Sequence, residues 1–137
     1  MRPISVHLPG FYVAGQTVRT TNQNETQAET AKIPALWSDF FATSPALPVY
    51  GVYSNYASDA SGPFDVTAGS EAQSGLHIQP GRYLVFSARG AMPAAVIASW
   101  QRIWAYFEQH PEIERRFLTD FEAYTGPDAV DIHIGCR

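Results

Sequence analysis

A pattern that occurs once in each half of the chain constrains the fold more than any other feature of the sequence. Three pairs of segments match in the same order: Pro9–Tyr12 with Pro80–Tyr83, Trp37 and Phe41 with Trp100 and Trp104, and Asp65–Gly69 with Asp131–Gly135. Matches that keep their order indicate a duplicated unit. We place the first copy at about residues 9–70 and the second at about residues 80–137.

Each copy is predicted to run strand, helix, strand, strand. Apolar residues recur at helical spacing from Ile33 to Phe41, and again between Pro93 and Pro111. Alternating or aromatic-rich segments bounded by turn residues predict the strands: Pro9–Val18, Val49–Tyr56, Phe64–Ala68, Gly81–Ala88, Phe117–Tyr124 and Val130–Gly135. The segment Thr20–Glu29 is polar and is expected to be a loop, with Asn22 or Asn24 as possible helix caps. The segment Ser70–Gln79 is polar and only loosely patterned.

Two βαββ units predict an α+β fold with pseudo-twofold symmetry. The strands of both units are expected to form one antiparallel sheet, with both helices on one face, since helices bury their apolar side against a sheet. Ligands favour clefts between such elements, so we expect a ligand cleft between the helices. The chain has 137 residues, which fits a single domain over 1–137.

Composition argues against several classes of partner and compartment. The chain has 13 acidic and 9 Lys or Arg residues, and its only adjacent basic pair is Arg115-Arg116, which predicts no direct binding of nucleic acid. No apolar run approaches the roughly 20 residues of a membrane span. A single cysteine, Cys136, and the lack of a signal peptide pattern predict a cytoplasmic protein.

Signals for catalysis and for cofactors are weak. The four histidines have no metal-ligand spacing, no glycine-rich phosphate loop is present, and no nucleophile-elbow pattern occurs. We therefore expect no metal, no cofactor and no catalytic residues, and consider an enzyme less favoured than a binding protein.

Aromatic residues are unusually frequent, with 3 Trp, 7 Tyr and 8 Phe. Trp37 and Phe41 are four residues apart on one predicted helix, as are Trp100 and Trp104 on the other, so each pair shares a helix face. Such rings are either ordinary core or the wall of a site for planar or cationic ligands. The two interpretations are evenly balanced on these residues alone.

Glu122 is an acid within the aromatic-rich strand Phe117–Tyr124. Two interpretations are open: a surface carboxylate paired with Arg115, Arg116 or Arg82, or a buried carboxylate that requires a cation. The aromatic setting favours the buried one. Matching Tyr124 to Tyr56 in the repeat predicts that Tyr50 and Tyr56 share the face of Glu122, with Tyr83 as a weaker candidate for the lining.

Several of these segments together resemble a known family, and the resemblance covers nearly the whole chain. They are Pro9–Arg19, Ile33–Trp37, Tyr50–Tyr53, Pro80–Tyr83 and Asp120–Tyr124. They are similar to the gyrase-inhibitor-like (GyrI-like) effector-binding domain that is attached to many AraC-type and MerR-type transcription activators. The resemblance implies the duplicated βαββ fold, and a cleft for hydrophobic molecules, often lipophilic cations. The resemblance implies that Glu122 is the glutamate that meets the cation. Trp37 also lies within one of the matching segments.

The DNA-binding domain of those regulators has no counterpart in the sequence, which resembles free-standing members of the family. We expect a multispecific binding module for hydrophobic or cationic small molecules, acting as a sensor through a protein partner or as a drug-sequestering protein. One alternative is a hydrolase of strained hydrophobic natural products in which Glu122 acts as an acid or base. The other is a gyrase-inhibitor-like module that binds a protein, and a homodimer is also possible.

Overall fold

The computed structural model describes residues 2–137. It contains eight strands and three helices in the order β1 (Ile4–Leu8), β2 (Phe11–Thr20), α1 (Asn22–Glu25), α2 (Ile33–Phe41), β3 (Val49–Ser54), β4 (Phe64–Ala72), β5 (Leu76–Ile78), β6 (Gly81–Arg89), α3 (Ala94–Gln109), β7 (Thr119–Gly126) and β8 (Ala129–Cys136).

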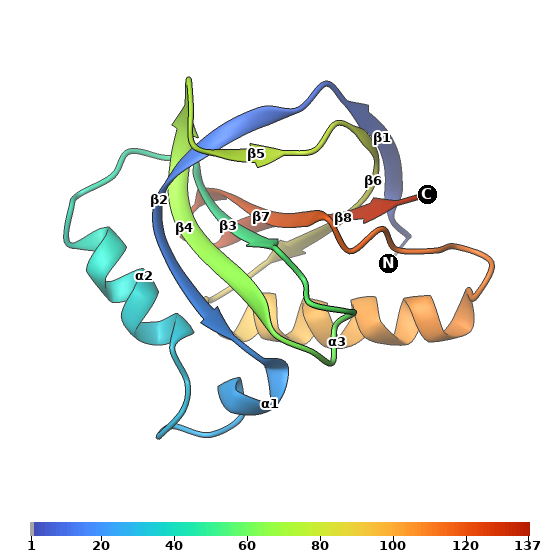
Figure 1. The fold of residues 1–137 in the computed structure, drawn as a ribbon, viewed down its shortest axis with the longest axis horizontal. Helices are drawn as coiled ribbons and strands as arrows, with labels where there is room; N and C mark the ends of the chain where they lie inside the picture. Colours follow the sequence, from blue (N-terminus) through green and yellow to red (C-terminus); the bar gives the residue numbers. More distant parts are fainter. Residues whose placement is uncertain (1) are drawn as a thin grey trace.

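The strands form one antiparallel sheet in the order β1-β6-β8-β7-β3-β4-β2-β5. The sheet curls into a half-barrel, and α2 and α3 cover the same face of it (Figure 1). Of the inner six strands, β6-β8-β7 belong to the second unit and β3-β4-β2 to the first. The order of the equivalent strands is reversed between the two units, as a twofold axis between β7 and β3 requires. The predicted α+β fold, its duplicated βαββ units and its two helices on one face are therefore confirmed.

Two short strands that the sequence did not predict join the halves to each other. β1 precedes β2 in the chain but pairs with β6 of the second unit, and β5 precedes β6 but pairs with β2 of the first. Each unit is thus preceded by a short strand that lies on the outer edge of the other unit. The exchange is symmetric, and it caps both outer strands of the inner sheet with a partner.

Glycines make the tight corners at which these exchanged strands end. Gly10 lies between β1 and β2, and Gly81 begins β6 directly after β5, with φ angles of 87° and 136°. Residues with side chains rarely adopt such angles. At Gly81 a Cβ would also lie 2.6 Å from Nη1 of Arg116. The Pro-Gly pair repeated in the sequence therefore marks the same corner in each unit.

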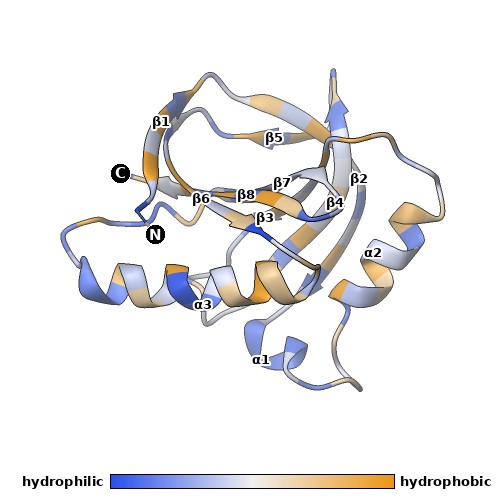
Figure 2. Cartoon of the chain, turned by 180° about the vertical axis from the view of Figure 1, so that it is seen from behind, coloured by the Kyte–Doolittle hydropathy of each residue, from blue (hydrophilic) through white to orange (hydrophobic). Residues whose placement is uncertain are grey.

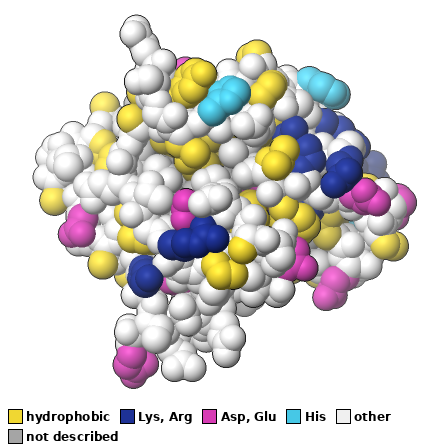
Figure 3. Space-filling view, in the orientation of Figure 1, with side chains coloured by type: hydrophobic (Ala, Val, Ile, Leu, Met, Phe, Trp, Pro, Cys, Tyr) yellow, Lys and Arg dark blue, Asp and Glu magenta, His cyan; other side chains and the backbone are white. Residues whose placement is uncertain are grey.

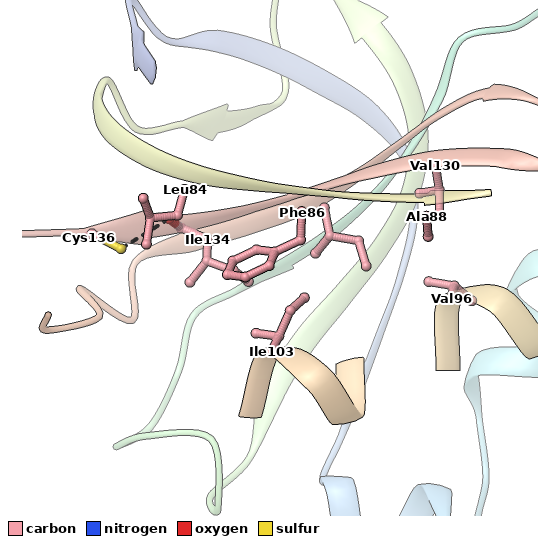
Figure 4. Close-up of a cluster of buried hydrophobic side chains, with 9 residues drawn as sticks. Leu84, Phe86, Ala88, Val96, Ile103, Val130, Ile134 and Cys136 are labelled. Atoms are coloured by element: carbon pink, nitrogen blue, oxygen red, sulfur yellow. Dashed lines mark hydrogen bonds between the residues drawn. The ribbon is translucent and has the colours of Figure 1, made fainter. Parts of the chain in front are cut away.

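The helices are held by apolar contacts with the sheet. Val96 and Ile103 of α3 point toward Phe86 on β6 and toward strand β8 (Figure 4). Leu36 and Phe40 of α2 pack in the equivalent way against the first unit. Burying an aliphatic or aromatic side chain contributes about 1.5–3 kcal/mol, so these contacts fix where each helix lies. The chain coloured by hydropathy shows the same division, with apolar segments along the central strands and a polar α1 (Figure 2).

The segment 20–29, expected to be a loop, contains the short helix α1. Its cap is Thr21, whose Oγ1 accepts a hydrogen bond from the amide of Asn24 at 3.0 Å, so neither predicted asparagine cap is correct. The Glu25 carboxylate then accepts the backbone amides of Lys32 and Ile33 at 2.9 and 3.1 Å. These amides begin α2 and have no partner within the helix. α1 is thereby fixed against the start of α2.

Within residues 2–137 no helix is long and apolar enough to cross a membrane. On the face seen in Figure 1, basic side chains lie in small separate groups with acidic side chains beside them (Figure 3). The expectation of no direct binding to nucleic acid stays a prediction.

Candidate functional site

Glu122 lies on β7, on the face of the sheet that the helices cover, and only 3% of its surface is exposed. Its cross-strand partner is Gly51 on β3. A Cβ at Gly51 would lie 2.8 Å from the Trp37 ring and 2.9 Å from Oε1 of Glu122. The glycine therefore leaves the space that the carboxylate and the indole occupy.

Three neutral donors hold the Glu122 carboxylate. The Trp100 Nε1–H and the Tyr53 hydroxyl donate to Oε2 at 2.6 and 2.8 Å, and the Tyr124 hydroxyl donates to Oε1 at 2.8 Å. No Lys, Arg or His within residues 2–137 forms an ion pair with it. The surface interpretation, in which Glu122 pairs with Arg115, Arg116 or Arg82, is therefore wrong.

Burial raises the pKa of Glu122, and the hydrogen bonds from Trp100, Tyr53 and Tyr124 limit the rise. Burial also raises the pKa of Tyr53 and of Tyr124 well above the ordinary tyrosine value, and the nearby Glu122 charge adds to both shifts. The two hydroxyls consequently keep their protons and remain donors.

A cavity of about 540 Å³ opens beside this carboxylate. Tyr53 and Trp100 hydrogen-bond to Glu122 and also line the cavity, so two rings separate the charge from the space. The lining comes from α1 and the segment after it, the start of α2, β3, the connection to β4, the start of β4, α3 and the segment before β7: Asn22, Gln23, Glu25, Thr26, Ile33, Tyr53, Tyr56, Ala60, Phe64, Ile97, Trp100, Gln101, Trp104 and Arg115.

Helix α3 has two apolar stripes, and only one of them faces the core. Val96 and Ile103 are buried against the sheet. Ile97 and Trp104 line the cavity and are 55% and 43% exposed, which is high for large apolar side chains. Exposed apolar surface gathered in a concave site is typical of ligand binding.

A family model for integron-associated effector-binding proteins (Cass2) matches residues 6–135. The chain belongs to this family. The predicted resemblance to GyrI-like effector-binding domains is thereby confirmed. No curated protein matches the chain.

Solved structures agree with this assignment. An integron cassette protein from the mobile metagenome of Vibrio cholerae, VCH_CASS2, is 38% identical with a TM-score of 0.91, over 99% of this chain and 96% of that one. SAV2435 bound to tetraphenylphosphonium is 16% identical with a TM-score of 0.78, over 100% and 94%. A proposed bacterial transcription regulation protein from Staphylococcus aureus MU50 is 14% identical with a TM-score of 0.76, over 100% and 99%. The last two likenesses show the fold alone.

The structure of this effector-binding protein places the four predicted helix aromatics in two different settings. Trp100 and Trp104 line the cavity. Trp37 lies beside Glu122 without lining the cavity, and its ring packs edge-on against Tyr124 at 5.3 Å. Phe41 stacks on the outer side of Trp37 at 5.5 Å and is 51% exposed.

Tyr50 and Tyr83 lie on the opposite face of the sheet, so the predicted placement of Tyr50 on the face of Glu122 is wrong. Both pack with Phe121 in a separate cluster, at ring distances of 6.1 and 5.5 Å. The error lies in matching Tyr56 to Tyr124. β3 ends at Ser54 and Asn55 has a positive φ of 51°, so Tyr56 no longer follows the alternation of the strand.

Tyr53, rather than Tyr50, is the β3 tyrosine that reaches the site, and the sequence analysis missed it. It also missed a second buried acid, Asp120, two residues before Glu122. The Asp120 carboxylate accepts hydrogen bonds from the Tyr56 hydroxyl at 2.6 Å and the Gly135 amide at 2.8 Å, and it pairs with Arg115 at 2.8 Å. Alternation along β7 places Asp120 on the face of Glu122, but the pairing with Arg115 needed the structure.

Within residues 2–137 no group of three or more His, Cys, Asp or Glu side chains is arranged to hold a metal ion.

Proposed function

We propose that this protein is a multispecific binding module for lipophilic aromatic cations. One observation carries the proposal: Glu122 is buried, receives hydrogen bonds from neutral groups alone, and lies behind the aromatic wall of a cavity of about 540 Å³. A buried carboxylate is stable only with a counter-charge or after taking up a proton. A cationic ligand supplies the counter-charge.

The expected selectivity follows from the charge. A cation about 7 Å from Glu122 gains roughly 2 kcal/mol at an effective dielectric constant near 20, which is about a 30-fold change in affinity. Trp100, Trp104 and Tyr53 add attraction between the cation and their ring faces. Because ring contacts impose few directional demands, the same cavity accepts aromatic cations of different shapes.

The likeness to SAV2435, whose structure contains tetraphenylphosphonium, supports the choice of that cation as a first probe. It also motivates the role that we propose: a cytoplasmic protein that senses or sequesters cationic compounds, and that regulates transcription through a partner rather than by binding DNA itself. The hydrolase alternative requires Glu122 to exchange a proton with a substrate or a water molecule. It gains no support, because both carboxylate oxygens accept hydrogen bonds from Trp100, Tyr53 and Tyr124 and the carboxylate does not line the cavity.

The test is a tryptophan-fluorescence titration with tetraphenylphosphonium on the wild type and two matched variants. Trp104→Ala removes an exposed helix aromatic that lines the cavity, whereas Phe41→Ala removes one that does not. We expect saturable binding by the wild type, about tenfold weaker binding by Trp104→Ala, and a change within about twofold for Phe41→Ala. Absence of saturable binding, or equal losses in both variants, would refute binding in this cavity.

A further inference from the structure

Arg115 introduces a second polar group into the cavity that the binding of simple cations does not use. It is the only basic residue among those that line the cavity in the described chain. Its side chain is 9% exposed and lies over the ring of Phe117, with 4.4 Å between the guanidinium carbon and the ring centre. The guanidinium is therefore fixed in position at the wall of the cavity.

Most of the hydrogen-bonding capacity of Arg115 is unused. A guanidinium has five N–H donors. Nη2 donates to Asp120 at 2.8 Å, and Nε is buried without an acceptor, where a ligand in the cavity does not reach it. Nη1 has no acceptor among residues 2–137 and is not buried, so it is the donor left for a ligand. Because the side chain is fixed in the cavity wall, Nη1 is positioned to donate to an acceptor that comes from outside the chain.

The charge of Arg115 does not oppose the binding of cations, because the fully buried Asp120 neutralises it at 2.8 Å. Arg115 therefore offers donors to a ligand without making the cavity cationic. A simple anion gains little at such a site, since Glu122 and Glu25 both lie close to the cavity and neither forms an ion pair within residues 2–137. A cationic ligand that also carries an acceptor oxygen can interact with both ends of the cavity: its charge with Glu122 at one end, and its oxygen with Arg115 at the other.

The two ends are within reach of one aromatic ligand. Asp120, which holds Arg115, and Glu122 are two residues apart on one strand face, a separation of about 7 Å. Their tyrosine partners Tyr56 and Tyr53 pack on the same ring, Phe64, at 5.7 and 5.8 Å. A planar ligand lying over Phe64 spans the distance between the two ends.

We propose that the cavity selects aromatic cations that also carry an acceptor oxygen, above all a carboxylate, and that Arg115 binds this oxygen. The proposal rests on the proposed function and names its ligand class: zwitterionic aromatic compounds rather than lipophilic cations in general.

A matched pair of dyes tests this by fluorescence anisotropy. Rhodamine 110 carries a delocalised cation and a free benzoate, and rhodamine 123 is its methyl ester. We expect the wild type to bind rhodamine 110 about tenfold more tightly than rhodamine 123, because only the acid offers Arg115 a charged acceptor, whereas the ester offers a neutral carbonyl. In Arg115→Lys, which keeps a cation for Asp120 but loses the planar set of donors, the ratio should fall to within about twofold. Arg102→Lys, on the exposed part of α3, is the control and should retain the ratio.

The outcomes separate the two proposals. If rhodamine 123 binds and rhodamine 110 binds no more tightly, the role of Arg115 is wrong while the proposed function stands. If neither dye binds, both proposals fail. The ratio of the wild-type affinities for the two dyes decides this even if Arg115→Lys does not fold. A crystal structure that places the benzoate of rhodamine 110 away from Arg115 would also overturn the inference.

Discussion

Asp120 and Glu122 lie on the same face of β7, and both are buried, but the protein satisfies them differently. Asp120 receives an arginine, a tyrosine hydroxyl and a backbone amide. Glu122 receives a tryptophan and two tyrosines, all neutral. The difference between the two sites is one cation. Asp120 forms an ion pair with Arg115, whereas Glu122 has no ion-pair partner within residues 2–137, and in the function that we propose the ligand supplies its counter-charge.

This contrast predicts different effects on stability and on ligand binding when the Arg115–Asp120 pair is broken and when the charge of Glu122 is removed. Asp120 depends on Arg115 to remain buried and charged, so removing the arginine leaves an unpaired charge in the core. Among the described residues, Glu122 has no such partner to lose. Stability should therefore depend strongly on the first site and weakly on the second, and ligand binding should show the reverse dependence.

The largest expected effect is on the stability of Arg115→Ala. Removing one partner of a buried pair typically lowers the free energy of unfolding by about 3–5 kcal/mol. Glu122→Gln, which removes a charge that no cation balances, should stay within about 1 kcal/mol of the wild type. Urea unfolding at pH 7 measures both.

Arg19→Ala provides the control for the first result. It removes an ion pair with Asp65 in which the side chains are 42% and 24% exposed, so a loss below about 1 kcal/mol is expected. If Arg115→Ala and Arg19→Ala unfolded at the same urea concentration, the burial of Asp120 would not depend on Arg115, and the contrast between the two acids would be lost.

A smaller effect is expected from pH, because burial raises the pKa of Glu122 in the folded protein. As pH falls through this raised value, the carboxylate takes up a proton and its attraction for a cation disappears. Affinity for tetraphenylphosphonium, which does not titrate, should fall by up to about tenfold per pH unit, beginning above the pH at which an ordinary glutamate titrates. Calorimetric titrations across this range measure the midpoint.

The stability of the free protein should change in the opposite direction. The folded state binds the Glu122 proton more tightly than the unfolded state does, so the Glu122 contribution to stability is fully present below the unfolded pKa and is lost as pH rises through the folded pKa. Glu122→Gln should lack both dependences. A wild-type cation affinity that stays constant until the pH of an ordinary glutamate would contradict the raised pKa.

The sequence was sufficient for the features that depend on local pattern. The repeat fixed the order of elements, and the acid in an aromatic strand correctly indicated that Glu122 is buried. The short strands β1 and β5 were missed because five and three residues carry too little alternation, and their stability comes from pairing with the other unit. Where β1 and β5 lie is therefore determined by their pairing with β6 and β2 in the folded sheet, which a local sequence pattern does not contain.

The remaining errors concern which residues meet across the sheet. Alignment by residue type placed Tyr50 on the same face of the sheet as Glu122, but the register pairs Gly51 with Glu122 and directs Tyr53 to the site. A one-residue slip moves every side chain to the other face. Arg115 was considered only as a surface partner of Glu122, because its burial depends on Asp120 and Phe117, which a sequence pattern does not place around it.

The most direct test of the central claim uses two ions of the same shape and opposite charge, tetraphenylphosphonium and tetraphenylborate. Calorimetric titration at pH 7 should show that the wild type binds the cation about 100-fold more tightly than the borate. In Glu122→Gln the cation should lose about 30-fold in affinity, and most of the preference should disappear. A Glu122→Gln variant that keeps the full preference would show that the selectivity arises elsewhere, and it would contradict the assignment of Glu122 as the carboxylate that selects cations.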